Sequence, residues 1–351
     1  SIHKIEFYET NLLGGEIFRS LRPFFQDNNT LSLLEVEQCT FGAGCARQLS
    51  LMLRVCSNSL KCFKLSEIEM EGEPLTETIQ ALCSHPQLEQ LGLQNANIGT
   101  NECRALAALM HSAAMLHTLD LQNNEINDEG VDALICAALT RLRILHLGHN
   151  NITARGCQSV ANLLESEDCS LEEIDLSDNN IGDEGARMFV KALASNCKLK
   201  TLDLYNNGIT SEGYFSFPKV LCDTSSVNKT FLSNHTLGSV LGGGLADVRS
   251  LLALNKSSED KRQVAIRKIL KHHNHFDMQP FFEWDLKVLP VAVDWFDRAR
   301  SIEDTDGAVI GKHKLGAIYQ FIRGMPEVFE PAPAPVAGGE KRKRSAVDGS
   351  G

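Results

Sequence analysis

Apolar and polar residues alternate along this chain in a block that recurs every 26–29 residues. The clearest copy, LHTLDLQNNEINDEG, begins at Leu116 and has apolar residues at its positions 1, 4, 6 and 11. The same spacing begins again at Leu142, Leu171 and Leu199. Looser copies begin at Ile2, Leu31, Leu60, Leu88 and Val227. Self-similarity at this period predicts a solenoid of about nine repeats, each of which packs on its neighbours.

Each block predicts a short strand, a turn and a helix. Positions 4 and 6 lie two residues apart, so both side chains point to one face of a strand, while position 5 points to the other face. Further along, the apolar spacing changes to i, i+3, i+7, as in Ala186, Phe189 and Leu193, which predicts a helix. A glycine at position 15 allows close approach of the backbone where the chain turns into this helix. These glycines are Gly130, Gly156, Gly185 and Gly213.

Position 9 is an asparagine in four consecutive blocks. A buried amide has two donor hydrogens and an acceptor oxygen, so stacked copies can satisfy the backbone of the turns that leave the strands. The asparagines are Asn124, Asn150, Asn179 and Asn207. In the first three blocks position 9 is Thr10, Cys39 and Ile68, so we expect no asparagine ladder there.

This pattern, LxxLxLxxNxI followed by EG, resembles the ribonuclease-inhibitor-like class of leucine-rich repeats. The resemblance covers about two-thirds of the chain and is most specific between Leu116 and Leu221. It implies an α/β leucine-rich-repeat solenoid, a horseshoe with a parallel sheet on its concave side and helices on its convex side. Protein binding is the common activity of this class, and catalysis is rare in it.

The repeat period predicts a division of the chain into three segments. Residues 1–238 form the solenoid, residues 239–328 form a C-terminal helical cap, and residues 329–351 form a disordered tail. The tail contains a basic tetrad, Lys341–Arg344, which is either a nuclear import signal or a basic run of the kind common in tails. The chain begins at Ser1 without a methionine and the first strand follows at once, so we expect further repeats or a cap upstream.

Composition narrows the choice of partner and compartment. A formal net charge of −11 argues against nonspecific binding to nucleic acid or to an anionic membrane. No secretory signal or membrane-spanning run is evident. The eleven cysteines lack C-x-x-C spacing and are expected to be buried thiols in a reducing compartment. We therefore expect a cytoplasmic protein, with a nuclear location left open.

Equal positions of neighbouring strands form rows across the concave face, because parallel strands lie about 4.8 Å apart. The row at position 5 is predicted to hold Glu6, Glu35, Lys64, Gly92, Asp120, His146, Asp175, Asp203 and Phe231. With neighbouring positions it predicts an acidic patch that suits a protein with a basic surface. The candidate partner-binding residues are Asp120, His146, His149, Glu173, Asp175, Asp178, Asp203 and Tyr205. The alternative is that aspartate at position 5 is simply a solvated polar residue of this repeat class.

Enzymatic sites are not indicated. No nucleophile elbow, HExxH motif or phosphate-binding loop is present, and we expect neither a cofactor nor a metal. The cluster His272–His275 is expected to be solvated rather than metal-binding. The sequence thus favours a non-catalytic interaction scaffold. Two alternatives remain: a Ran-type activator of a small GTPase, and a sensor module of a larger receptor. The oligomeric state is not predicted.

Overall fold

The computed structural model describes the chain from residue 2 to residue 273 with short gaps. The described residues are 2–12, 15–26, 30–42, 44–56, 59–70, 75–136, 141–242 and 248–273. All of them belong to one compact unit, Ser1–Asn274. The remainder of the predicted cap and the predicted tail lie outside the described residues, so their boundaries stay predictions.

Nine strands of the described chain form one parallel sheet, in which consecutive repeats pair in register. In spatial order they are β1 (Lys4–Tyr8), β2 (Leu33–Glu37), β4 (Cys62–Ser66), β6 (Gln90–Gln94), β7 (Thr118–Asp120), β8 (Ile144–His146), β9 (Glu173–Asp175), β10 (Thr201–Asp203) and β11 (Ser239–Leu241). Because each strand pairs with the next one along the chain, the predicted α/β leucine-rich-repeat solenoid is confirmed.

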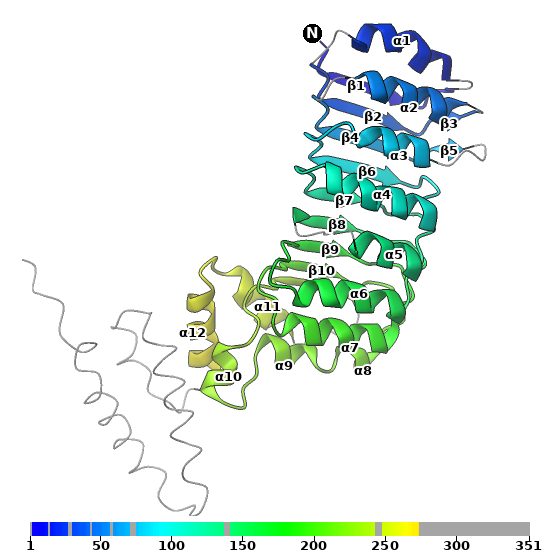
Figure 1. Ribbon diagram of the computed structural model, residues 1–351. Coiled ribbons are helices and arrows are strands. Elements are labelled where there is room, and N and C mark those ends of the chain that lie inside the picture. Colours follow the sequence, from blue (N-terminus) through cyan, green and yellow to red (C-terminus); the bar gives the residue numbers. More distant parts are fainter. Residues whose placement is uncertain are drawn as a thin grey trace, which may run out of the picture. The chain divides into compact units, whose positions relative to one another are not determined.

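A helix lies between each of these strands and the next, and Figure 1 shows these helices stacked along one face of the sheet. They are α1 (Glu16–Gln26), α2 (Cys45–Val55), α3 (Thr76–Leu82), α4 (Thr100–Ser112), α5 (Asp128–Ile135), α6 (Ala154–Glu165), α7 (Gly182–Leu193) and α8 (Ser211–Tyr214). In the described chain four further helices follow: α9 (Phe217–Leu221), α10 (Val227–Phe231), α11 (Arg249–Lys256) and α12 (Lys261–His272). The opposite face of the sheet, not covered by these helices, is called the open face below.

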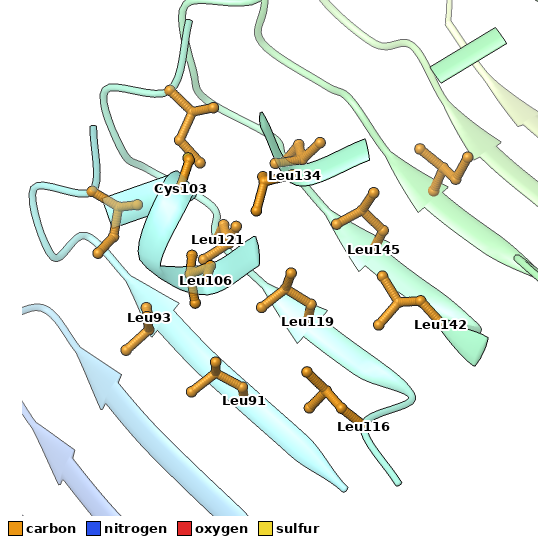
Figure 2. Packing of buried hydrophobic residues seen from close by; sticks show 14 of the residues in the cluster. Leu91, Leu93, Cys103, Leu106, Leu116, Leu119, Leu121, Leu134, Leu142 and Leu145 are labelled. Atoms are coloured by element: carbon orange, nitrogen blue, oxygen red, sulfur yellow. The ribbon is translucent and has the colours of Figure 1, made fainter. Parts of the chain in front are cut away.

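The core lies between the sheet and the helices. Leu119 and Leu121, at positions 4 and 6 of their repeat, are fully buried beneath Leu106 of α4. Figure 2 shows the same arrangement from repeat to repeat, with leucines of neighbouring strands in contact. Each repeat therefore buries its apolar side only through its neighbours, as expected of a solenoid.

The predicted asparagine ladder is present in the four central turns. Asn124 accepts hydrogen bonds at Oδ1 from the backbone N–H groups of Ala96 and Ile98, one repeat earlier. Its Nδ2 donates to the carbonyl oxygen of Leu93 at 2.7 Å and to that of Leu121 at 2.9 Å. Equivalent bonds are made by Asn150, Asn179 and Asn207.

The first repeats satisfy the same backbone positions in another way. Two short strands, β3 (Thr40–Phe41) and β5 (Glu69–Met70), pair directly with each other after the main strands. At position 9 the Cys39 thiol lies 3.4 Å from the backbone N of Thr10 and 3.2 Å from the carbonyl oxygen of Glu37. Backbone pairing and a thiol thus replace the amide ladder.

The prediction of a ninth strand beginning at Val227 is wrong. Residues Val227–Phe231 form α10, because Ser226 caps a helix there by accepting a hydrogen bond from the backbone N of Lys229 at 3.1 Å. The ninth strand is β11, with Leu237 at position 1 instead of Val227. Position 5 of that repeat is therefore Leu241, and Phe231 does not belong to the row.

A second set of buried asparagines connects the last repeats to the C-terminal helices. Asn196 donates to the carbonyl oxygen of Leu164, and Asn234 donates to that of Leu193, both at 2.9 Å. Asn255 of α11 in turn donates to the carbonyl oxygen of Leu237 at 2.7 Å. The sequence reasoning missed these residues, whose bonds continue the stack from the last repeat into α11.

Candidate partner-binding face

The predicted row at position 5 is confirmed except at its last member. Cα pairing places Asp120 beside His146, His146 beside Asp175, and Asp175 beside Asp203. The row continues on the other side through Gly92, Lys64, Glu35 and Glu6. Leu241 ends the row in place of Phe231.

His146 joins two carboxylates on the open face. Its Nδ1 lies 3.5 Å from Oδ2 of Asp120, and its Nε2 lies 3.2 Å from Oε1 of Glu173. The hydrogen bond to Asp120 raises the pKa of His146, although burial opposes this. Burial disfavours the charged form of Asp120, yet hydrogen bonds from His146, Gln122 and Gln94 keep the pKa of that carboxyl below its ordinary value. Glu173 provides this second carboxylate, although Asp175 is the next member of the row after His146.

Asp175 is held by uncharged donors. The Nε2 of Gln122 donates to Oδ2 of Asp175 at 2.5 Å, and Ser177 donates to Oδ1 from its backbone N at 2.8 Å and from its hydroxyl at 2.7 Å. Gln122 reaches Asp175 across the intervening repeat because position 7 of that repeat is Gly148. A Cβ on Gly148 would lie 2.8 Å from Oγ of Ser177 and 3.1 Å from Oδ2 of Asp175.

The negative charge of Asp203 is stabilised by fewer contacts than the charges of its neighbours in the row. Its carboxylate accepts a hydrogen bond from the backbone N of Tyr205 at 2.9 Å, and no ion pair with a cation of the described chain involves it. Burial, followed by the charges of Asp175 and Asp178, raises the pKa of Asp203. Tyr205 is 62% exposed and Leu241 is 49% exposed at the same end of the sheet. This corner therefore combines a carboxylate that has no cationic partner in the described chain with accessible apolar surface.

His149 and Asp178 occupy position 8, at the rim where each strand turns. The Nε2 of His149 lies 3.1 Å from Oδ2 of Asp178, and Asn206 donates to Oδ1 of Asp178 at 2.5 Å. Every residue at position 8 from Glu9 to Asn206 has a left-handed backbone, with φ between 46° and 56°. This conformation is uncommon for residues other than glycine and was not predicted. It sets the direction of the His149 and Asp178 side chains.

The open face of the first repeats is also acidic. Glu6 and Glu35 lie side by side in the row, and Glu37 follows at position 7. Lys64 forms an ion pair with Glu35 at 3.3 Å, and its side chain extends over Gly92. Tyr8 is 56% exposed at position 7 of the first repeat, the position that Tyr205 has in the eighth. The sequence analysis did not select Tyr8, although its position in the repeat was visible.

Two expectations about other polar groups need correction. His273 is buried and its Nε2 lies 2.8 Å from the hydroxyl oxygen of Thr230, so this histidine is not solvated as predicted. His272 is exposed, and His275 lies outside the described residues. All eleven cysteines are free thiols, but Cys136 and Cys197 are exposed rather than buried. Among the described residues, no group of three or more histidine, cysteine, aspartate or glutamate side chains is arranged to hold a metal ion.

None of the helices in the described chain combines the length and the apolar character that crossing a membrane requires.

Comparison with known proteins agrees with the repeat structure. The Leucine Rich repeat family model matches residues 112–134, 138–161, 167–190 and 195–217. The chain is 34% identical to the ribonuclease inhibitor of Sus scrofa over 169 residues, which is 46% of this chain and 36% of that protein. It is 33% identical to the ribonuclease inhibitor of Mus musculus over 193 residues, which is 52% of this chain and 41% of that protein.

A second group of relatives is much longer. The human NACHT, LRR and PYD domains-containing protein 3 is 31% identical over 169 residues, which is 46% of this chain and 16% of that protein. The chain therefore spans less than half the length of the relatives described here. Among solved structures, actin-binding site 2 of leiomodin-1 aligns with 13% identity and a TM-score of 0.31 over 59% of this chain and 94% of that one, which carries no argument about function.

Proposed function

We propose that this chain, a leucine-rich-repeat protein of the ribonuclease-inhibitor-like type, is a non-catalytic intracellular scaffold that binds a protein partner on its open face. The partner surface is basic, and the contact is centred on repeats 5–8. The residues proposed to contact it are Asp120, His146, His149, Glu173, Asp175, Asp178, Asp203 and Tyr205.

The observation that carries the proposal is the position of Asp203. Its carboxylate is partly buried beside Asp175 and Asp178 and has no cationic partner among the residues that the structure describes, so a lysine or arginine from outside would stabilise its charged form. Tyr205 beside it is one of the residue types enriched at the centres of protein interfaces. The other carboxylates already have partners within the chain. They would therefore orient the bound protein more than they would increase its affinity.

The rigidity of the face also supports this function. Asp120, Asp175 and Asp178 accept hydrogen bonds from side chains of other repeats, and the asparagine ladder ties the backbone below them. Binding to such a preformed surface requires little ordering of side chains, which lowers the entropic cost of association.

The test is a charge reversal with a matched control. The double variant Asp175→Lys with Asp203→Lys changes the open face, while Glu129→Lys with Glu184→Lys makes the same change in charge at exposed positions in the first turns of α5 and α7. Each purified chain is used as bait in cell extract, and captured proteins are identified by mass spectrometry. We expect a specific set that the wild type and the helix variant capture and the open-face variant does not.

That set is then purified and its affinity for the three chains is measured by calorimetry at two salt concentrations. We expect a loss of at least about 100-fold for the open-face variant, because reversing a carboxylate both removes an attraction and adds a repulsion. Equal affinity for all three chains would show that the partner binds elsewhere.

A second candidate function is suggested by the longer relatives. The match to the human NACHT, LRR and PYD domains-containing protein 3 covers 16% of that protein, so the same type of repeat occurs there as one part of a larger chain. In that case the face would act as the sensor module of a receptor. The discriminating observation is the full-length transcript, which would have to encode a nucleotide-binding domain joined to this segment.

A further inference from the structure

Lys268 of α12 is fully buried, although lysine is rarely found inside proteins without partners. All three donors of its ammonium group are used. Nζ donates to the carbonyl oxygen of Leu221 at 2.5 Å and to that of Asn234 at 2.8 Å, and it lies 3.1 Å from Nδ1 of His235. This cage joins α12 to the end of α9 and to the turn that precedes β11.

The third acceptor of the cage depends on the protonation state of His235. The Nε2 of His235 lies 2.8 Å from the carbonyl oxygen of Phe231, and a carbonyl oxygen can only accept. The proton of the neutral ring is therefore on Nε2, and Nδ1 has the lone pair that accepts from Lys268. Neutral His235 is the state in which every polar contact of the cage is satisfied.

A second proton on His235 would disrupt this arrangement. Nδ1 would become a donor facing another donor, and two positive charges would lie about 3 Å apart in a largely buried site. Burial, together with the charge of Lys268, lowers the pKa of His235 to about 4. Burial also lowers the pKa of Lys268 to about 8, so the lysine is charged at neutral pH.

The surroundings strengthen the effect. Lys261 of α12 adds a further positive charge near His235, and Lys271 follows on the same helix. The Cys222 thiol, whose pKa burial raises, also acts on Lys268. His273, directly after α12, is a further titratable group there, and its Nε2 lies 2.8 Å from Oγ1 of Thr230. Asp223, next to Cys222, is the one carboxylate among the charges acting on that thiol.

We propose that His235 and Lys268 form an acid-sensitive latch, which holds α12 on the last repeat at neutral pH and releases it when His235 becomes protonated. Release uncovers the apolar side of α12 around Val264 and Ile269, which is buried while the latch is closed and α12 packs on α10 and α11. The latch therefore controls the exposure of apolar surface next to the last repeat.

The sign of the pH dependence follows from linkage. The pKa of His235 is depressed to about 4 in the latched state and returns towards its ordinary value of 6.5 when α12 is released. Between these values the released state binds more protons, so the latched state loses stability as the pH falls. The opening equilibrium then rises about tenfold per pH unit, or roughly 30-fold between pH 7.5 and pH 5.

Hydrogen–deuterium exchange of the full 351-residue chain tests this. Exchange is measured between pH 7.5 and pH 5 and corrected for the intrinsic rate at each pH. Peptides from α12 are compared with peptides from α6, which lies in the well-formed repeats. We expect protection of α12 to fall about 30-fold over this range while protection of α6 changes far less. Parallel changes in both helices would overturn the proposal, because they would indicate general acid unfolding.

Two variants separate the latch from other titrations. His235→Asn places an amide oxygen near the position of Nδ1, so it accepts from Lys268 but does not titrate; α12 should then stay protected at pH 5. His272→Asn removes an exposed histidine of the same helix and should keep the wild-type pH dependence. A wild-type pH dependence in His235→Asn would rule out His235 as the titrating group.

Discussion

Asn150 donates a hydrogen bond from Nδ2 to the carbonyl oxygen of Leu121 at 3.0 Å, although the two residues are 29 positions apart. The same amide donates to the carbonyl oxygen of Leu147 at 3.0 Å within its own repeat, and its Oδ1 accepts from the backbone N of Ile126 at 2.9 Å. One buried side chain thus satisfies backbone groups of two repeats. The asparagine amide at position 9 therefore connects the backbone of one repeat to that of the next.

We expect Asn150→Ala to lower the free energy of unfolding by about 3 kcal/mol, because several buried backbone groups lose their partner and leaving such a group unsatisfied costs about 1–3 kcal/mol. Urea denaturation followed by circular dichroism measures the change. Asn151→Ala is the control, since the adjacent side chain is exposed and its backbone makes the bridge to Asn127. Similar losses in both variants would mean that the ladder contributes little.

Much of the fold follows from the spacing of apolar residues. Leu119 and Leu121 are both buried because positions two apart share a face of a strand, and this simple rule also placed Asp120 and His146 side by side on the other face. In a parallel sheet with uniform register, residues at the same repeat position lie in one row across the sheet. The residues of the candidate face could therefore be predicted from the sequence.

The errors lie where the repeat weakens. In VNKTFL the apolar residues suggested a strand, but Val227 and Phe231 are also four residues apart, and Ser226 caps the helix that they form. At the core-facing positions 1, 4 and 6, the true ninth strand has apolar side chains only at Leu237 and Val240, because position 6 is Gly242. Its signal is therefore short. Contacts such as that of Lys268 with Leu221 depend on packing of segments that no local pattern relates.

The glycines at position 15 provide space rather than an unusual backbone. A Cβ on Gly156 would lie 2.6 Å from Oδ1 of Asp128 and 3.0 Å from Cγ2 of Ile152. Asp128 cannot easily move, because it accepts hydrogen bonds from the backbone N and the hydroxyl of Thr153. Gly156→Ala should therefore reduce the free energy of unfolding by about 1–3 kcal/mol, as overpacking usually does.

Gly92→Ala is the matched comparison for that measurement by urea denaturation. Its nearest neighbour would be Cγ of Lys64 at 3.3 Å, part of a flexible and half-exposed side chain. We expect no loss, and a gain of up to about 1 kcal/mol, because alanine restricts the unfolded chain more than glycine does. If Gly92→Ala proved as costly as Gly156→Ala, the close contact with Asp128 would not be the cause.

Position 8 has a left-handed backbone, with a φ of 53° at His149. We therefore expect the stability of substitutions at His149 to depend on how well the new residue tolerates this conformation. Both His149→Asn and His149→Val remove the contact with Asp178, so this loss cancels when the two variants are compared. Asparagine tolerates the left-handed region, whereas a β-branched residue is strained there by about 1–2 kcal/mol. Thermal unfolding should show the valine variant to be the less stable by that amount; equal stability would contradict a rigid left-handed turn.

The contact between His146 and Asp120 predicts how the stability of the fold depends on pH. The pKa of His146 is raised above 6.5 by its hydrogen bond to Asp120, so the stabilisation is complete below pH 6.5 and is lost as the pH rises through the raised value. For Asp120, burial acts against the charged form, but the hydrogen bonds from His146, Gln122 and Gln94 lower its pKa below 3.8. Its contribution is therefore present above pH 3.8 and is lost as the pH falls through the lowered value.

We expect Asp120→Asn to lower the pKa of His146, because the amide cannot supply the negative charge that favours the imidazolium. NMR titration of the ring proton on Cε1 of His146 measures this directly. Asp168→Asn, an exposed change away from the open face, should leave the titration of His146 as it is in the wild type. An unchanged titration in Asp120→Asn would transfer the effect to Glu173, which lies 3.2 Å from the other ring nitrogen, and Glu173→Gln would then produce the shift.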